Sequence, residues 1–240
     1  MSENFFKNTI KIASLMAWVL GIFFVASFVV AIVIRIVAEL GIGVNTDSTV
    51  FNFSFAAIVY TLATVLVIGL PWWIRKKKTT KKELGLDRLV SWGDLLITPA
   101  GLVVYFVLSA MLVGLAINIL PWFDINQSQD VGFDNLIFRY EYTLAFVALV
   151  VIAPFAEEVL FRGYLYGKIK HYAPVWLAII LSSVLFGVAH GAWNVGVDTF
   201  ALGIILCLLR EITGSLWASI FVHMAKNGLA YYLLFINPVL

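Results

Sequence analysis

Four residues in the second half of the sequence carry the side chains that hydrolysis of an amide bond needs. They are a glutamate, two histidines and an asparagine: Glu157, His190, His223 and Asn227. A carboxylate and a histidine can together hold and deprotonate a water molecule. A second histidine and an asparagine amide can donate hydrogen bonds to the oxyanion that develops on the attacked carbonyl. The set therefore fits peptide-bond hydrolysis without a serine or cysteine nucleophile.

The two adjacent glutamates, Glu157 and Glu158, cannot point in the same direction on a helix, because consecutive residues are about 100° apart. Arg162 follows Glu158 by four residues and can form an ion pair with it. Glu157 is then left to face another group. We therefore predict one structural glutamate and one reactive glutamate. Pro154, one turn earlier, predicts a kink beside them.

The same groups could also bind a metal ion, because two histidines and a glutamate can ligate zinc. The His-Glu-x-x-His helix motif of zinc peptidases is absent from the sequence. We expect no metal and no other cofactor, and zinc stays open as the alternative.

The composition places these polar residues in a membrane protein. Of the 240 residues, 62% are hydrophobic and 12% are charged, and this charged fraction is about half that of ordinary soluble domains. A soluble fold of this size cannot bury so much apolar surface. The composition excludes a nucleic-acid-binding protein and a disordered chain. Because Cys207 is the single cysteine, no intrachain disulfide can form.

Uncharged stretches predict an all-α fold, a polytopic membrane helix bundle of about seven transmembrane helices, with six to eight compatible with the pattern. The expected spans are 12–34, 53–74, 95–120, 142–168, 174–192, 198–212 and 216–236. We expect a single integral membrane domain over residues 1–240. Within it, residues 1–140 would form scaffold helices and residues 142–237 would form the catalytic core.

Basic residues predict the orientation. Seven of the 16 Lys and Arg residues lie between Arg75 and Arg88, so this loop and the N-terminus are expected on the cytoplasmic side. The loops 41–52 and 124–141 would then lie outside. The second of these is acidic, with Asp124, Asp130 and Asp134 among its residues.

Distances along the helices suggest that the four reactive residues lie at a similar depth. With a cytoplasmic turn near 171–174, Glu157 and His190 would each lie about 23–25 Å from it, at about 1.5 Å per residue. With the next such turn near 213–215, His223 would lie about 13 Å and Asn227 about 19 Å beyond it. Ionisable groups at membrane depth are costly and usually functional. Antiparallel spans would thus bring the four residues to a common zone.

Three ordered motifs, Glu157-Glu158-x-x-x-Arg162, Phe186-x-x-x-His190 and His223-x-x-x-Asn227, resemble those of the CPBP superfamily. This superfamily contains the type II CAAX prenyl endopeptidases and the bacterial Abi proteins, some of which are linked to bacteriocin self-immunity. The resemblance covers roughly residues 142–237. The first 140 residues share only a general hydrophobic character with the family.

The resemblance implies a glutamate-dependent intramembrane endopeptidase, a hydrolase that cleaves a membrane-associated protein or peptide. By this resemblance, Glu157 and His190 would activate water, while His223 and Asn227 would form the oxyanion hole. The supporting residues would be Glu158, Arg162 and Phe186. The glutamate mechanism needs no metal, and nothing in the sequence shows that the substrate is prenylated. The compact chain resembles bacterial members, so we expect a bacterial cell membrane, contacts with its lipids and no nucleic-acid partner.

Two other interpretations stay open. A non-catalytic bacteriocin-immunity or membrane scaffold protein would keep its phenotype when Glu157 and His190 are replaced. A proton-coupled transporter would use the same residues as a relay and would have a through-path or internal repeats. The sequence shows no internal repeat. Lys226, close to Asn227, could extend toward the membrane surface or pair with a glutamate.

Overall fold

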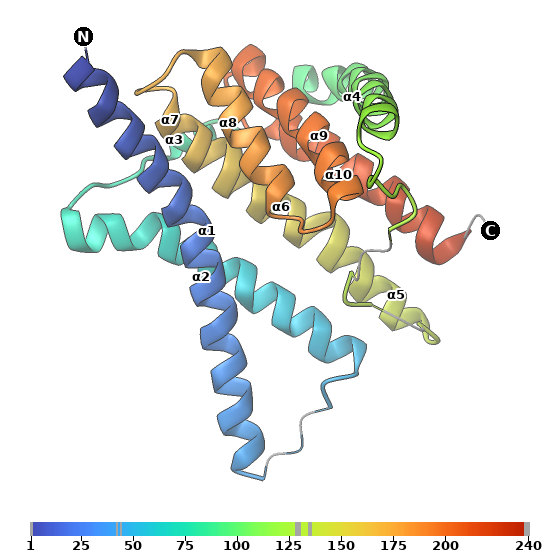
Figure 1. Cartoon of the computed structure of the whole chain (residues 1–240). Coiled ribbons are helices and arrows are strands. Elements are labelled where there is room, and N and C mark those ends of the chain that lie inside the picture. The colour runs from blue at the N-terminus through green and yellow to red at the C-terminus, as the bar shows by residue number, and fades with distance from the viewer. Residues whose placement is uncertain (1, 42, 44, 128–130, 134–135, 238–240) are drawn as a thin grey trace. The chain divides into compact units, whose positions relative to one another are not determined.

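The computed structural model describes residues 2–41, 43, 45–127, 131–133 and 136–237, and over these residues all regular secondary structure is helical (Figure 1). The predicted all-α class is therefore confirmed. Asp130 and Asp134 of the acidic loop lie outside the described residues. The α-helices are α1 (Ser2–Glu39), α2 (Thr49–Arg75), α3 (Lys81–Leu84), α4 (Trp92–Ile119), α5 (Arg139–Phe146), α6 (Ala153–Glu157), α7 (Gly167–Ile169), α8 (Val175–Val188), α9 (Trp193–Thr213) and α10 (Trp217–Tyr231). The π-helical segments are η1 (Val147–Ile152), η2 (Glu158–Tyr166) and η3 (Tyr232–Ile236).

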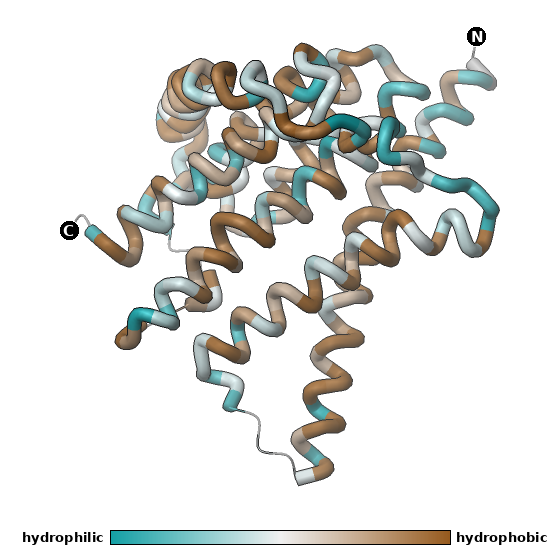
Figure 2. Tube along the Cα trace, turned by 180° about the vertical axis from the view of Figure 1, so that it is seen from behind, coloured by the Kyte–Doolittle hydropathy of each residue, from teal (hydrophilic) through white to brown (hydrophobic). Residues whose placement is uncertain are grey.

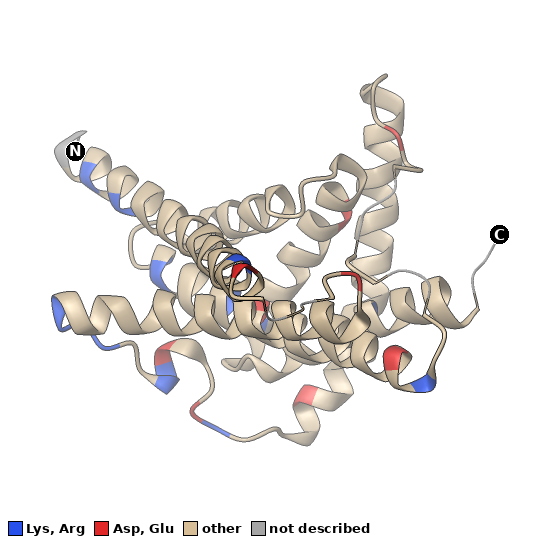
Figure 3. Cartoon of the chain, turned by 90° about the horizontal axis from the view of Figure 1, so that it is seen from below, with Lys and Arg blue, Asp and Glu red and all other residues tan. Residues whose placement is uncertain are grey.

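Four helical segments are long and apolar enough to cross a membrane: Asn4–Glu39, Thr49–Arg75, Trp92–Ile119 and Arg139–Ile169. In each of the first three segments, at most 22% of the most apolar stretch of 18 residues is buried inside the protein. Most of this apolar surface therefore needs another apolar environment. Long hydrophobic stretches cover these helices in Figure 2, and charged residues are sparse along them in Figure 3. The chain is therefore a polytopic helical membrane protein.

The fifth predicted span, 174–192, is longer than the helix that forms there. α8 has 14 residues, about 21 Å at 1.5 Å per residue. Pro174 lies at the N-cap of α8. The N–H that proline lacks would have no hydrogen-bond partner within the helix at this position. At the other end, the chain turns at Gly191, which has a φ of +74° that an L side chain rarely adopts. His190 therefore lies in the turn after α8, not within it.

By its contacts the chain forms two compact units. Unit 1 comprises Met1–Trp18, Thr79–Gln129 and Glu158–His223. Unit 2 comprises Val19–Lys78, Asp130–Glu157 and Met224–Leu240. Two of the peptide bonds at which the chain passes between the units lie directly after Glu157 and directly after His223. The predicted division into scaffold and catalytic core concerns the roles of residues 1–140 and 142–237, and it stays a prediction.

In unit 1, α9 lies against both α4 and α8 (Figure 1). Small residues let the backbones of α8 and α9 approach closely, as is usual between helices in membranes. A Cβ atom added to Gly187 would lie only 2.6 Å from the carbonyl oxygen of Gly196, and one added to Gly203 would lie 2.9 Å from Cβ of Ser183. This tight contact fixes the end of α8, which is next to His190.

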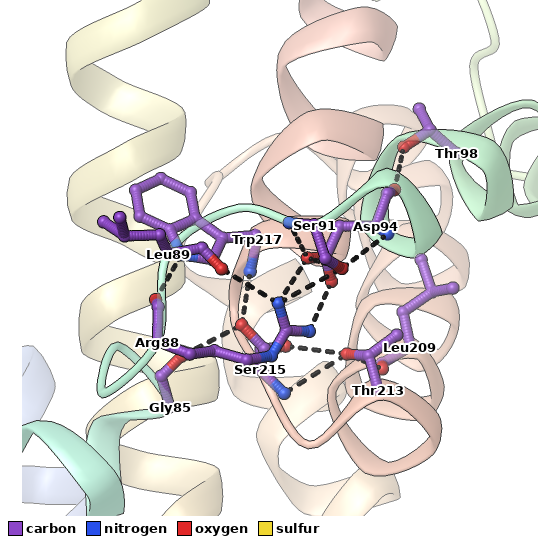
Figure 4. A network of polar contacts seen from close by, with 10 residues as sticks. All are labelled: Gly85, Arg88, Leu89, Ser91, Asp94, Thr98, Leu209, Thr213, Ser215 and Trp217. Atoms are coloured by element: carbon purple, nitrogen blue, oxygen red, sulfur yellow. Dashed lines mark hydrogen bonds and ion pairs between the residues drawn. The ribbon is translucent and has the colours of Figure 1, made fainter.

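A polar network fixes the segment that leads into α4 (Figure 4). The buried carboxylate of Asp94 accepts hydrogen bonds from Nη1 and Nη2 of Arg88 at 2.5 and 2.8 Å, and from the backbone N–H of Ser91 at 2.8 Å. The hydrogen bond to Asp94 raises the pKa of the Arg88 guanidinium above its ordinary value. Nε1 of Trp217 donates to the carbonyl of Arg88 at 2.9 Å. The start of α10 is thereby held to this segment.

In unit 2, α2 lies against α5, η1 and α6. Phe133, Ala145 and Tyr231 belong to the buried apolar cluster of this unit. The hydroxyl of Tyr231 donates to the carbonyl of Tyr142 at 2.9 Å, and its ring meets that of Phe146 edge to face. These contacts hold the C-terminal part of α10, which carries Asn227, against α5.

Candidate active site

A buried carboxylate lies at the centre of the polar cluster of unit 1. Glu158, the first residue of η2, has no exposed side-chain surface. Its Oε1 atom accepts a hydrogen bond from Nη1 of Arg162 at 2.8 Å and one from Nδ1 of His223 at 2.9 Å. The pairing of Glu158 with Arg162 that the spacing predicts is therefore present. Because an isolated buried charge is very costly, each member of this pair depends on the other.

The ring of Phe186 packs against three of the polar groups in unit 1. Cζ of Arg162 lies 4.0 Å from the ring centroid, within the range of a cation–π interaction. Nε and Nη2 of Arg162 have no hydrogen-bond partner among the described residues, so the face of Phe186 offsets part of the cost of burying the guanidinium. The rings of His190 and His223 lie edge to face with Phe186, at 4.8 and 5.7 Å between centroids. Phe186 thus orients both histidines.

The tautomer of His190 follows from its backbone contact. Nδ1 of His190 lies 2.8 Å from the carbonyl oxygen of Phe186. A carbonyl only accepts, so Nδ1 carries the proton and donates it to this bond. In the neutral ring, Nε2 then has a lone pair and can accept a proton. His190 is half-buried.

His223 is 2% exposed and is held by the carboxylate of Glu158. Because Glu158 is ion-paired with Arg162, its oxygen acts as an acceptor and Nδ1 of His223 acts as the donor. The chemistry of Nε2 then depends on the charge of the ring. In the neutral ring Nε2 accepts a hydrogen bond, and in the cationic ring it donates one. A role for His223 in binding an oxyanion therefore requires the imidazolium form.

In unit 2, the carboxylate of Glu157 is held by a tyrosine from α2. Glu157 is the last residue of α6, and its Oε1 atom accepts a hydrogen bond from the hydroxyl of Tyr60 at 2.6 Å. Tyr60 also packs edge to face against Phe23, with 5.5 Å between the ring centroids. Sequence reasoning missed Tyr60, which lies 97 residues before Glu157. A lone tyrosine within an uncharged stretch has no spacing to a partner that could reveal it.

The side chain of Asn227 donates a hydrogen bond to a backbone carbonyl for which Pro154 supplies no N–H donor. The backbone N–H of Ala153 bonds to the carbonyl of Ala148, five residues earlier, as in a π-helix. The carbonyl of Leu149 would bond next to residue 154, but Pro154 has no N–H. Nδ2 of Asn227 donates to this Leu149 carbonyl at 3.0 Å. The kink expected at Pro154 thus takes the form of a π-helical turn that Asn227 completes.

The predicted site residues are divided between the two units. The cluster of unit 1 contains Glu158, Arg162, Phe186, His190 and His223, joined by the contacts above. Glu157 and Asn227 belong to unit 2, where each has its own partner. Among the described residues, no group of three or more His, Cys, Asp and Glu side chains could hold a metal ion.

Comparisons with known proteins agree with the sequence motifs. The profile of the family described as "Type II CAAX prenyl endopeptidase Rce1-like" matches residues 139–229. The membrane-embedded CAAX protease MroQ of Staphylococcus aureus (strain USA300) is 23% identical over an alignment of 210 residues that covers 82% of this chain and 78% of that protein. YdiL of Bacillus subtilis (strain 168) is 27% identical over 84 residues, 35% of this chain and 34% of that protein.

A further relative is the UPF0177 protein YxdF of Lactococcus lactis subsp. lactis (strain IL1403), which is 28% identical over 138 residues, 56% of this chain and 70% of that protein. The chain thus matches about a third of the length of YdiL and about three quarters of the length of MroQ. No solved structure matches the chain significantly.

Proposed function

Because the chain belongs to the Rce1-like family of type II CAAX prenyl endopeptidases, we propose that it is a glutamate-dependent intramembrane endopeptidase. Its substrate is a membrane-associated protein or peptide, prenylated or not. Glu157 and His190 activate the attacking water, and His223 and Asn227 stabilise the oxyanion. Glu158, Arg162 and Phe186 keep the histidines in place.

In the proposed reaction, the water oxygen attacks the scissile carbonyl carbon and its proton passes to Glu157 or to Nε2 of His190. The tetrahedral oxyanion is bound by Nε2–H of His223, which is in its imidazolium form, and by the amide Nδ2–H of Asn227. When the intermediate collapses, the C–N bond breaks and the abstracted proton moves to the leaving amine. The products are a new carboxylate and a new amine, and no covalent enzyme intermediate forms.

The observation that best supports this proposal is the contact between Nδ1 of His190 and the carbonyl of Phe186. It fixes the tautomer in which Nε2 can take a proton from water, which is the role that the proposal gives to His190. The contact of His223 with Glu158 supports the second part of the proposal, because it makes Nδ1 a donor and holds the ring in a fixed orientation.

The proposed topology has seven spans with a cytoplasmic N-terminus. Helical segments coincide with all seven predicted spans, and four of the described helices have the length and apolarity of membrane spans. The basic segment Arg75–Arg88 supports a cytoplasmic loop between the second and third spans. By this proposal the protein is in a bacterial cell membrane.

A cleavage assay in proteoliposomes tests the proposed function. The probe is an internally quenched peptide that ends in a farnesylated Cys-aliphatic-aliphatic-X sequence, with the unprenylated peptide run in parallel. In ¹⁸O-labelled water we expect one ¹⁸O atom in the new C-terminal carboxylate. We expect wild-type protein to cleave a probe and the Glu157→Gln variant to be at least a hundredfold slower. Glu39→Gln, which changes an exposed glutamate of α1, serves as the control. Equal turnover by Glu157→Gln and wild type would exclude the proposal.

A further inference from the structure

Four consecutive cations lie at the C-terminal end of α2: Arg75, Lys76, Lys77 and Lys78. We call these four residues the basic end of α2. All four are exposed (Figure 3), and none of them forms an ion pair with another described residue. The sequence over 75–82 contains six Lys and Arg residues and no Asp or Glu. The positive charge of this surface is therefore open to an external anion.

Two lysines of unit 1 show a different arrangement. Nζ of Lys170 lies 2.6 Å from Oε1 of Glu211, and Nζ of Lys168 lies 3.6 Å from Oε2 of Glu83. Each of these cations has a carboxylate of the same chain beside it. The basic end of α2 thus differs from Lys168 and Lys170 in having no acidic partner, and this difference provides a matched control.

Two exposed tryptophans relate the basic end of α2 to the membrane surface. Trp72 and Trp73, directly before the four cations, have exposed fractions of 57% and 73%. Tryptophan is enriched where a membrane span meets the headgroups, and α2 has the length and apolarity of a span. The cations that follow Trp73 are therefore expected at the level of the lipid headgroups, where the side chains can extend to the phosphates.

The backbone of Lys76 gives a second reason to assign a role to this surface. Lys76 has a φ of +55° and is the only residue other than glycine with a positive φ among the described residues. The backbone N–H groups of Lys76 and Lys77 both donate to the carbonyl of Pro71, which closes the helix end. Glycine usually takes this left-handed position, because a Cβ atom makes it unfavourable. A lysine that accepts this strain indicates a use for its side chain.

We propose that the basic end of α2 binds the anionic headgroups of phospholipids, such as those of phosphatidylglycerol, in preference to zwitterionic headgroups. Ammonium and guanidinium groups donate charge-assisted hydrogen bonds to phosphate oxygens. Each Lys or Arg beside an anionic membrane surface strengthens the attraction about fivefold. The tryptophan pair favours a lipid surface over a soluble polyanion as the partner. This binding does not depend on the proposed peptidase activity.

Native mass spectrometry of the full chain in detergent, titrated with phosphatidylglycerol or phosphatidylcholine, tests the preference. We expect the anionic lipid to bind at least about tenfold more tightly, and Lys77→Gln/Lys78→Gln to lose about tenfold to thirtyfold of this affinity. Five of the seven cations in Arg75–Arg88 remain in this variant, which preserves the orientation signal. Lys168→Gln/Lys170→Gln makes the same change in charge and should stay within about twofold of wild type. Equal affinities for the two lipids, or equal losses in the two variants, would overturn the proposal.

Two substitutions of Lys76 separate its charge from its backbone conformation. Lys76→Gly keeps the left-handed turn and removes one cation, whereas Lys76→Arg keeps a cation at the same φ. We expect Lys76→Gly to lower the affinity for phosphatidylglycerol about fivefold and Lys76→Arg to stay within about twofold. Thermal unfolding shows that both variants are folded. A folded Lys76→Gly protein with the affinity of wild type would contradict the role given to this lysine.

Photolabelling in phosphatidylcholine vesicles locates the bound headgroup. The vesicles contain phosphatidylglycerol with an aryl azide on its headgroup or, in parallel, phosphatidylcholine with the same azide. We expect the anionic probe to label 72–78, less so when NaCl is raised from about 0.05 M to about 0.5 M. Glycerol 3-phosphate in the solution should leave this label unchanged. Equal labelling by the two probes would show that the cations set only the orientation, and loss of label to glycerol 3-phosphate would exclude the lipid as the partner.

Discussion

Nδ1 of His223 lies 2.9 Å from Oε1 of Glu158, the oxygen that also accepts a hydrogen bond from Arg162. One carboxylate oxygen therefore balances the charge of a buried guanidinium and determines which nitrogen of a buried imidazole carries a proton. With a neutral His223 the three side chains sum to zero charge, and with an imidazolium they sum to +1. The cationic form is thus best stabilised when an oxyanion is present, which is when the proposed mechanism needs it.

Replacing Glu158 should destabilise the protein strongly. Glu158→Gln leaves the fully buried Arg162 without its anionic partner, and breaking such a pair costs about 3–5 kcal/mol. Adding Arg162→Met removes the uncompensated charge and should recover part of this loss. Unfolding of the purified protein in detergent, followed by circular dichroism, measures both effects. The account of this pair would be wrong if the double variant were no more stable than Glu158→Gln.

Phe186→Leu should impair catalysis through the histidines. It removes the ring face that lies under Arg162, worth about 1–2 kcal/mol for a desolvated cation–π contact, and the ring edges that hold His190 and His223. We expect kcat to fall about tenfold or more, by loss of orientation. Phe161→Leu is the comparison, because the ring of Phe161 contacts Phe186 at 5.0 Å. Equal kcat values for the two variants would argue against a specific role for Phe186.

Gly85→Ala should be much more harmful than Gly41→Ala. Gly85 and Gly41 have φ angles of 76° and 78°, a conformation that costs an L residue about 1 kcal/mol. A Cβ atom at Gly41 would have none of the described residues within 4 Å, whereas one at Gly85 would clash with the guanidinium of Arg210. The difference in unfolding free energy between the two variants isolates this clash. Similar stabilities would show that Arg210 can move aside at little cost.

Asn227 should have separable effects on stability and on rate. Asn227→Ala leaves the carbonyl of Leu149 without its donor, which costs about 1–3 kcal/mol, and removes a proposed oxyanion donor, which costs about 10²–10³ in kcat. Adding Pro154→Ala supplies a backbone N–H near that carbonyl and should restore stability while kcat stays low. Recovery of both quantities in the double variant would show that Asn227 acts only through the backbone.

Local patterns were predictable from the sequence, and distant contacts were not. The spacing of Glu158 and Arg162 predicts their ion pair, because it concerns one turn of helix. The partners of Glu157 and His223, in contrast, lie 97 and 65 residues away, and no periodicity encodes which helices pack together. Four of the seven predicted spans were found as long apolar helices. They were predictable because hydrophobicity, like the spacing of the ion pair, is a property of one continuous segment.

The sequence pattern also did not predict where α8 ends. Hydropathy continues from 174 to 192 without a charge, yet α8 ends at Val188. The chain there turns into a left-handed conformation at Gly191, and this local geometry is not visible in apolar character. The roles of Glu157, His190, His223 and Asn227 in catalysis stay predictions, which the variants above address.

The central claim is that Glu157 activates the water that cleaves the substrate. The most direct measurement is the single-turnover cleavage rate of the farnesylated quenched peptide by wild type and by Glu157→Gln, reconstituted at equal amounts and shown to be folded by their unfolding transitions. We predict a loss of at least a hundredfold in Glu157→Gln, with Glu39→Gln at the wild-type rate. A folded Glu157→Gln protein that cleaves at the wild-type rate would contradict the account.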